Sequence, residues 1–469
     1  MNKRSYLSIL LVCLPVLLLT QIVRAQQPSS NPQADERFKA DILVIVAHPD
    51  DESMIAGYLA KETLDEHKRV AVVIATRGNA GQNLVGYEQD HSLAEIREME
   101  ARQAVASIGI HNIWFLRAPD TPSPAGEIFD VTRSLETWNH GKVLGEMARF
   151  IRLTRPKIVI TMLPDVVVGE NHQDHQAAGV IATEAFDLAG DPTQFPEQVT
   201  TPDDRLWFGN KMEGLHPWQP QKLYYFTDAT QRDFLNGSGP EYSMTDTSPS
   251  QDVSYARLAA KEKSYHKTQY GDRPSQALKT GNLDRFERPL GFVLGKSLVG
   301  GSVTGDIFQG VVSHPIPFVP VQGYRPPERL PDYSLELGGA WAFYKQFWPA
   351  HNLDSMTGLL SPQVGVSEGQ DFPIPLLLHN NTDHAVTFHL NTQFPKGWAI
   401  DSTATQSQYI HHPMRVHTFE VDANGDYPVR IRLTAPQLDQ SQWQKIIWSA
   451  EADGQSVGLA TLNAYVRAN

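Results

Sequence analysis

Short, continuously apolar runs, the first of them rich in β-branched residues, are the strongest constraint on the fold of this chain. Five occur in its first half, at residues 41–47, 70–75, 113–116, 157–161 and 222–226. Continuous apolarity, without alternation, is typical of a strand buried on both faces. Helical patterns separate the runs, at roughly 53–66, 91–108, 141–153 and 173–188. Strands that alternate with helices predict parallel crossovers, and therefore an α/β fold in which helices cover both faces of a mostly parallel sheet.

The sequence changes character after about residue 355. Several short apolar stretches follow, separated by turn-forming residues such as 380–383, Asn424-Gly425 and Asp453-Gly454, and the last two are hairpin signals. This pattern predicts a small all-β domain, an Ig-like sandwich of roughly 100 residues. Prolines concentrated in 313–331 indicate a stiff connector before it. The predicted organisation is a leader at 1–25, an α/β domain at 26–312, a Pro-rich connector at 313–354 and a β-sandwich domain at 355–469.

The N-terminus has the three parts of a secretory signal peptide. Lys3 and Arg4 precede an apolar run over 7–19, and Val23-Arg24-Ala25 supplies a small-x-small cleavage signal. The run is shorter than the ~20 residues that span a bilayer. We therefore expect an exported protein, periplasmic or extracellular, with no integral membrane span after cleavage. The alternative is a retained N-terminal anchor.

Composition restricts the partners of the mature chain. Cys13, inside the leader, is the only cysteine, so neither a disulfide nor a thiolate metal site is expected. Cleavage would remove three basic residues and no acidic one, so the formal net charge would fall from −13 to −16. Such a charge repels nucleic acid and anionic membranes, and neither is expected as a partner. The sequence gives no indication of oligomeric state.

A polar cluster directly follows the first predicted strand. It reads Ala47-His48-Pro49-Asp50-Asp51-Glu52, and open parallel sheets bind ligands at the carboxyl ends of their strands. His48 and Asp51 are spaced so that both can bind one metal ion, and Pro49 stiffens the turn between them. Asp50 would then face a different direction, toward a bound water. The alternative is that the three carboxylates only cap the following helix.

A second cluster follows the fourth predicted strand. It contains His172-Gln173-Asp174-His175, at the start of a predicted helix where a satisfied pair of histidines is the alternative reading. His48, Asp51 and one of His172 or His175 would make three nitrogen and oxygen ligands. Three such ligands with an open fourth position are typical of a catalytic zinc site.

The two clusters together resemble the paired signatures of the PIG-L/LmbE-like deacetylases. Gln173 stands where proline is usual, and further similarity lies in Thr76-Arg77-Gly78 and in the helix from Arg97 to Gly109. The resemblance covers about residues 38–190. It implies a Rossmann-like α/β fold and zinc-dependent hydrolysis of the N-acetyl group of glucosamine derivatives or related amides.

The resemblance also implies roles for individual residues. It makes three residues the ligands of one zinc ion: His48, Asp51 and His175. Asp50 would be the general base that deprotonates the metal-bound water. His172 would protonate the leaving amine or steady the tetrahedral oxyanion, with Asp174 orienting its imidazole. Arg97 would bind a sugar hydroxyl of the substrate, unless it is an exposed helix residue that pairs with Glu100.

Some positions depart from the family pattern or lie outside its main signatures. Glu170 occupies a position where some relatives have a tyrosine that assists the oxyanion. His266 and Gln269, with Thr268 between them, are similar to a late His-x-Ser-Gln feature of the family, and we expect a structural role for them. The pair His411-His412 in the predicted β domain is expected to lie on the surface.

The expected function is hydrolysis of an N-acetyl or other N-acyl group from an N-acetylglucosamine-type substrate outside the cytoplasm. Two alternatives stay open. The chain could be a glycan-binding or scaffold protein that no longer turns over, which the predicted β sandwich suggests. It could also be a metalloamidase for a non-sugar amide.

Overall fold

The computed structural model describes residues 35–122, 130–169, 172–200, 213–327, 329–400 and 418–468. The predicted leader at 1–25, Glu170, and the pair His411 and His412 lie outside the described residues. Among those that are described, no helix is both long enough and apolar enough to cross a membrane.

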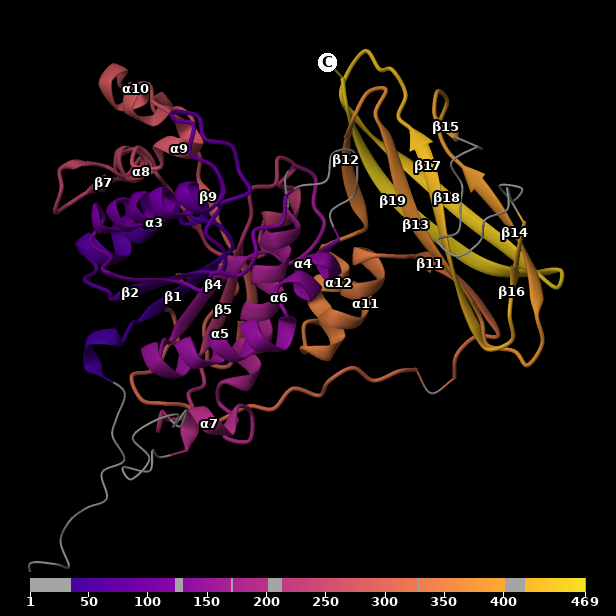
Figure 1. Cartoon of the computed structure of the whole chain (residues 1–469), viewed down its shortest axis with the longest axis horizontal. Coiled ribbons are helices and arrows are strands. Elements are labelled where there is room, and N and C mark those ends of the chain that lie inside the picture. Colours follow the sequence, from indigo (N-terminus) through magenta and orange to yellow (C-terminus); the bar gives the residue numbers. More distant parts are fainter. Residues whose placement is uncertain are drawn as a thin grey trace, which may run out of the picture.

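The first half of the chain is built on one six-stranded sheet (Figure 1). Its strands are β1 Ile42–Val46, β2 Val70–Ile74, β3 Asn112–Phe115, β4 Ile158–Met162, β5 Lys222–Phe226 and β10 Val293–Ser297. The order is β10-β5-β4-β1-β2-β3, with the first five strands in the chain parallel and β10 antiparallel at one edge. The five predicted apolar runs are thus the five parallel strands, and the predicted fold class is confirmed.

Helices cover both faces of this sheet because alternate strand residues point to opposite faces. Leu43 and Ile45 of β1 pack with α4, α5 and α6 on one face, whereas Ile42 and Val44 pack with α2, α3 and α8 on the other. The helices of this half are α2 Ala56–Ala60, α3 Asp90–Ala106, α4 Val131–Thr137, α5 His140–Thr154, α6 Gln173–Leu188, α7 Pro196–Val199, α8 Tyr255–Lys263, α9 Lys267–Tyr270 and α10 Arg273–Thr280. Two short strand pairs lie among the loops, β6 Glu241–Tyr242 with β9 Leu290–Gly291 and β7 Thr247–Ser248 with β8 Val253–Ser254.

The helix predicted at 53–66 is not continuous. It consists of a 3₁₀ turn at Asp51–Met54, α2, and a wide π turn at Lys61–Asp65. The hydroxyl of Thr63 donates to the carbonyl of Leu59 at 2.8 Å. The same hydroxyl also donates to the carbonyl of Ile108, which ties the π turn to the segment that follows α3.

The second half is a β sandwich of two sheets. Its strands are β11 Tyr333–Leu337, β12 Gln363–Ser367, β13 Asp371–Asn380, β14 Val386–Gln393, β15 Ala399–Ile400, β16 Thr418–Val421, β17 Gly425–Thr434, β18 Gln442–Ala452 and β19 Gln455–Arg467. One sheet has the order β11-β13-β17-β15 and the other β12-β19-β18-β14-β16. Inward-facing side chains of both sheets form the core, among them Phe372, Phe388 and Trp448. The all-β prediction is confirmed for this half.

Only one of the two predicted hairpin signals forms a hairpin. Asp453 and Gly454, with φ of 50° and 72°, join the paired strands β18 and β19. Asn424, with φ of 49°, instead leads from β16 to β17, which pair with strands of different sheets. The hairpin prediction at Asn424-Gly425 is therefore wrong, because the same local turn serves here to cross between the layers of the sandwich.

A helix between the two halves joins them into one continuous core (Figure 1). This helix, α11 Ala340–Ala350, is followed by α12 Asp354–Leu359. The indole nitrogen of Trp348 donates to Asp165 Oδ2 at 3.1 Å, and the hydroxyl of Tyr344 donates to Gln176 Oε1 at 2.9 Å.

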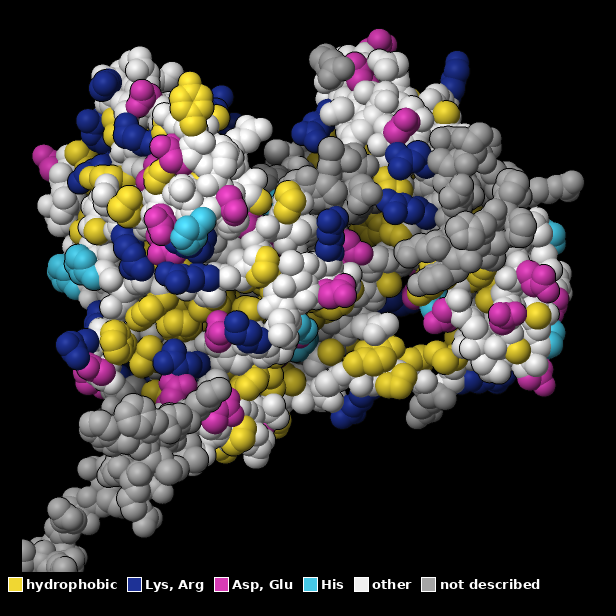
Figure 2. Space-filling model, viewed as in Figure 1, with side chains coloured by type: hydrophobic (Ala, Val, Ile, Leu, Met, Phe, Trp, Pro, Cys, Tyr) yellow, Lys and Arg dark blue, Asp and Glu magenta, His cyan; other side chains and the backbone are white. Residues whose placement is uncertain are grey.

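The predicted domain limits remain predictions, but the range predicted as a connector, 313–354, contains a strand of the sandwich and this helix. The prolines that suggested a connector lie before β11. On the face shown in Figure 2, acidic and basic side chains are interspersed, and the surface is indented between the two halves.

We predict that the anchoring of α11 is a major source of stability. Trp348 is only 2 % exposed and fills the contact between the halves, so Trp348→Ala should lower the free energy of unfolding by about 3–5 kcal/mol. The measurement is equilibrium unfolding in urea. Trp443→Ala is the matched control, because Trp443 is 44 % exposed, and its effect should be much smaller. Equal effects of the two substitutions would contradict this account of the interface.

Candidate active site

The two polar clusters meet because β1 and β4 are neighbours in the sheet. The two strands pair in parallel, so their carboxyl ends lie at the same edge. His48 and Asp51 follow β1, and His172 and His175 stand at the start of α6, after β4. Gly179 lets α6 approach the end of β4 closely, since a Cβ atom there would lie 2.3 Å from the carbonyl oxygen of Met162.

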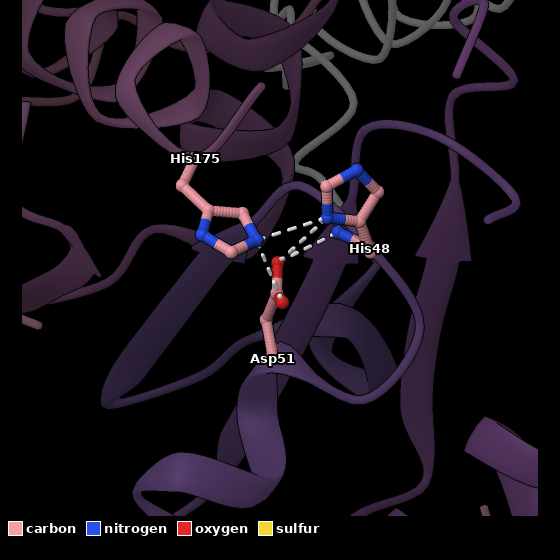
Figure 3. Close-up of side chains that lie close together, drawn as sticks. All are labelled: His48, Asp51 and His175. Atoms are coloured by element: carbon pink, nitrogen blue, oxygen red, sulfur yellow. Dashed lines mark hydrogen bonds and ion pairs between the residues drawn. The ribbon is translucent and has the colours of Figure 1, made fainter. Parts of the chain in front are cut away.

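Three side chains converge on one point at this edge (Figure 3). His175 Nε2 lies 3.0 Å from His48 Nδ1 and 3.2 Å from Asp51 Oδ1, and His48 Nδ1 lies 3.6 Å from Asp51 Oδ2. One ligand atom from each residue can be chosen so that all three lie within 4.8 Å of one another. The sequence left open whether His172 or His175 completes the set, and it is His175 that faces Asp51.

The chemistry of these three groups fits a zinc ion. Two imidazole nitrogens and a carboxylate oxygen form a donor set of the kind that catalytic zinc sites use. The carboxylate is fixed in place, since Asp51 Oδ2 accepts the backbone N–H groups of Ala47 at 3.0 Å and His48 at 2.7 Å. Asp51 is therefore held in position by the backbone of its own loop.

Carboxylates behind His48 orient its ring. His48 Nε2 lies 3.2 Å from Asp120 Oδ1 and 3.4 Å from Asp174 Oδ2. With the proton of His48 on Nε2 and directed at these carboxylates, Nδ1 presents its lone pair to His175 and Asp51. A histidine whose other nitrogen donates to a carboxylate is the usual arrangement around a bound metal.

The electrostatics of the cluster follow from its burial and from its pairs of opposite charge. Burial opposes the charged form of His48, but contacts with Asp120, Asp174 and Asp51 raise its pKa well above the usual range. Burial alone would raise the pKa of Asp51, yet the charges and hydrogen bonds of His175 and His48 lower it. Three carboxylates, those of Asp51, Asp120 and Asp174, thus lie around the two imidazoles of His48 and His175, and this excess of acidic groups favours a bound cation.

Asp50 lies beside the three converging residues in an unusual backbone conformation. Its φ is 126°, a region that residues other than glycine rarely adopt. Its backbone N–H donates to Glu52 Oε2 at 3.0 Å, and its Oδ2 accepts from the hydroxyl of Tyr270 at 2.7 Å. Burial and the neighbouring charge of Asp51 raise the pKa of Asp50. A carboxylate with a raised pKa is a better proton acceptor than one in water.

His172 caps the start of α6 and lies beside both His48 and His175. Its Nδ1 accepts the backbone N–H of Asp174 at 3.1 Å, so Nε2 carries the proton in the neutral ring. The ring centroids of His172 and His48 are 5.1 Å apart. Burial and the positive charges of His48 and His175 lower the pKa of His172 to about 4.

Asp174 contacts the two histidines through different groups, His172 through its backbone and His48 through its carboxylate. Its backbone N–H holds His172, as described, while its carboxylate lies against His48 and accepts from the backbone N–H of Thr121 at 2.9 Å and from the hydroxyl of Ser134. The sequence-based role of Asp174, orienting the imidazole of His172, is thus carried in this structure by its backbone N–H.

Sequence reasoning missed Asp120 and Ser134. Asp120 follows the carboxyl end of β3, as the two recognised clusters follow β1 and β4, and that position is the signal that could have found it. Burial would raise the pKa of Asp120, but the hydrogen bond and charge of His48 lower it. Ser134 lies within α4, and no local signal distinguishes it.

Arg97 is buried rather than exposed, at 5 % exposure, which rules out the alternative that it lies on the solvent face of its helix. Its guanidinium donates to the carbonyl oxygens of Gly78 and Gln82, the latter at 2.9 Å, and to Thr268 Oγ1 at 3.3 Å. The Glu100 carboxylate instead accepts from the backbone and the hydroxyl of Thr268. Arg97 therefore holds the loop that follows β2 at the edge of the candidate site.

We predict that metal binding depends on the three converging residues. Loss of a group that only orients a metal ligand weakens metal binding by roughly 10–100-fold. Ser134→Ala, which removes a hydrogen bond to the Asp174 carboxylate behind His48, should stay within that range. His175→Ala, which removes a ligand, should weaken zinc binding by well over that amount. Zinc titration of the metal-free protein measures both. His140→Ala is the control, since His140 pairs with Glu184 away from the site. Equal affinities for His175→Ala and His140→Ala would contradict the assignment.

Comparison with protein families gives a match over this part of the chain. Residues 43–186 match the family model described as PIG-L: GlcNAc-PI de-N-acetylase. The match includes all but the first residue of β1, all but the last two residues of α6 and every residue of the two clusters, so the resemblance found in the sequence is confirmed for this range.

Several curated proteins are similar to the same region. The 1D-myo-inositol 2-acetamido-2-deoxy-alpha-D-glucopyranoside deacetylase 1 of Catenulispora acidiphila is 27 % identical over 189 residues, which are 38 % of this chain and 58 % of that protein. The corresponding deacetylase of Thermobifida fusca is 27 % identical over 198 residues, 39 % of this chain and 60 % of that protein. The mycothiol S-conjugate amidase of Streptomyces coelicolor is 28 % identical over 193 residues, 39 % and 59 % of the two chains.

The chain thus spans about three fifths of the length of these relatives, 58 % to 60 %. Among solved structures, the N,N'-diacetylchitobiose deacetylase of Pyrococcus horikoshii has a TM-score of 0.39 and 20 % identity, covering 54 % of this chain and 84 % of that one.

Proposed function

We propose that this chain, which carries a PIG-L family domain over residues 43–186, is a zinc-dependent hydrolase that removes an N-acetyl or related N-acyl group from an N-acetylglucosamine-type substrate. One observation carries the proposal. The strand ends of β1 and β4 bring His48, Asp51 and His175 within contact of one another, with a proton acceptor and an imidazole donor beside them. The names of the similar deacetylases and amidase support the choice of bond and of an amino-sugar substrate.

His48, Asp51 and His175 would hold the zinc ion. When bound there, zinc polarises the amide carbonyl and lowers the pKa of a coordinated water to ~7. Asp50 then accepts the proton of the attacking water, for which its raised pKa and its fixed orientation are suited. General base catalysis of this kind contributes about 10²–10⁴-fold to the rate.

His172 would act on the carbonyl oxygen of the scissile amide. Its Nδ1 is occupied by the backbone N–H of Asp174 and its pKa is lowered. The neutral ring therefore presents Nε2–H as a hydrogen-bond donor. This supports stabilisation of the carbonyl oxygen as it gains negative charge, the second of the two roles expected for His172. Donation of a proton to the leaving amine by His172 requires the charged ring, which burial disfavours. The leaving amine would therefore take the proton that Asp50 has accepted from the water as the C–N bond breaks.

Arg97 would bind a hydroxyl group of the sugar while it holds the loop after β2. A guanidinium has five N–H donors, and three of its contacts are to Gly78, Gln82 and Thr268. The guanidinium also interacts with the charges of Asp50 and Asp120, so it lies near the candidate site. Fixing the loop and contacting the substrate are therefore compatible roles for this side chain.

We predict that replacement of Asp50 separates metal binding from turnover. Asp50→Asn should retain about one zinc per chain while the release of amine from N-acetylglucosamine-containing substrates falls by about 10²–10⁴-fold, because the amide cannot accept the proton. Metal content and amine release are measured on the same preparation. Asp284→Asn, at an exposed position, is the control and should be fully active.

The outcomes distinguish the alternatives. Zinc binding by the wild type without release of amine from any amino-sugar substrate would contradict the proposal and leave a metalloamidase for a non-sugar amide, or a glycan-binding protein. Equal turnover by wild type and Asp50→Asn would remove Asp50 from the reaction.

Export of the mature chain is a separate part of the proposal, and it rests on the N-terminal sequence. We predict cleavage after Ala25, so that the exported product of the full chain begins at Gln26. Mass spectrometry of the protein recovered outside the cytoplasm tests this. Ala25→Leu should block cleavage, because the site requires a small residue. A full-length product retained with the cells would instead indicate an N-terminal anchor.

A further inference from the structure

A second acidic group with a histidine lies directly behind the loop that carries Asp50. Glu52, Glu262 and His266 are all completely buried, at 0 % exposure. His266 Nε2 lies 3.1 Å from Glu52 Oε1 and 3.7 Å from Glu262 Oε1. Burying charged groups costs free energy unless they are paired with one another. We therefore asked what these three residues do in the apolar face packed by α2 and α8.

Glu52 connects this buried group to the backbone of Asp50. One oxygen of its carboxylate faces His266, and the other accepts the backbone N–H of Asp50 at 3.0 Å. Asp50 has a φ of 126° and a ψ of −15°, a conformation that persists in a residue with a side chain only where the surroundings enforce it. Glu52, held from behind by His266, supplies one of those constraints.

The residues that follow His266 supply two more. The side-chain amide of Gln269 donates to the carbonyl oxygen of Pro49. The hydroxyl of Tyr270 donates to Asp50 Oδ2 at 2.7 Å, which fixes the rotation of that carboxylate and with it the direction of Oδ1. The backbone on both sides of Asp50 and its carboxylate are thus each held by the segment 262–270.

We propose that the segment 262–270 positions Asp50, with Tyr270 as the positioning residue for its carboxylate and the group Glu52, Glu262 and His266 as the support for its backbone. This rests on the proposed function, in which Asp50 accepts the proton. The segment is about 220 residues from Asp50 in sequence and lies outside the range 43–186 that matches the family model. The geometry of the general base is therefore completed by a part of the chain that the family match does not include.

The test compares Tyr270→Phe and His266→Gln with Tyr265→Phe in the full mature chain. Tyr265, in the same segment, is the matched control. Tyr270→Phe should lower kcat by roughly 10–100-fold, the scale of a misplaced catalytic group, with KM and zinc content unchanged. His266→Gln should have a similar effect and, if it does not fold, Tyr270→Phe alone carries the test.

A double-substitution cycle separates positioning from general stability. If Tyr270 acts through Asp50, adding Tyr270→Phe to Asp50→Asn should reduce kcat no further, whereas independent effects would multiply. Multiplying effects, or unchanged kcat in Tyr270→Phe, would overturn the proposal. A wild type that releases no amine would instead overturn the proposed function.

Hydrogen exchange gives a readout that does not depend on activity. In the metal-free protein, peptides covering residues 47–54 should exchange faster in His266→Gln and Tyr270→Phe than in wild type or Tyr265→Phe, because the loop loses a constraint. Unchanged exchange would overturn the positioning role. Zinc bound by the His48→Ala, Asp51→Ala protein and lost on further His266→Gln would also overturn it, by making the buried group a second metal site.

Discussion

Everything at the candidate site depends on the parallel pairing of β1 with β4. The two strands are separated by more than a hundred residues of sequence, yet their register aligns Ile42 with Ile158 and brings both carboxyl ends to one edge. Each cluster alone is an ordinary start of a helix. Only when the two strands lie side by side do an aspartate from one loop and a histidine from the other share a point in space. Without that pairing, the set of three converging side chains would not exist.

Features that depend only on neighbouring residues could be predicted from the sequence. The five parallel strands are short apolar runs, and His48 and Asp51 are recognisable because their spacing and their place after a strand are both visible in the sequence. Asp120, Ser134 and Tyr270 were not recognised as parts of the site, because their contacts arise only when a loop and two helices from distant parts of the chain pack around it. The turn at Asn424 shows the same limit, since its local conformation was predictable but the sheets that it joins were not. Arg97 could be placed at the site by resemblance, whereas its burial under the loop of residues 78–82 required the tertiary structure.

Charge compensation explains why this region tolerates so many buried acids. Asp51, Asp120 and Asp174 all lie around His48 and His175, and each has a lowered pKa because of these imidazoles or neighbouring N–H donors. On the other side of the loop, Glu52 and Glu262 flank His266. The loop that carries Asp50 and Asp51 therefore lies between two clusters of acids and histidines. One is the candidate metal site, and the other is the completely buried group of Glu52, Glu262 and His266.

The hydrogen bond from Tyr344 to Gln176 has a consequence for how such chains can be recombined. Gln176 is the residue next to His175, so α11 is attached to the same turn of α6 that presents the histidine ligand. The β sandwich and α11 are therefore not an independent domain that can be exchanged without affecting α6. Exchanging everything after the proline-rich stretch would also replace α11, which supports the helix that carries His175. Substitutions in α11 and in the first turn of α6 should therefore be constrained together.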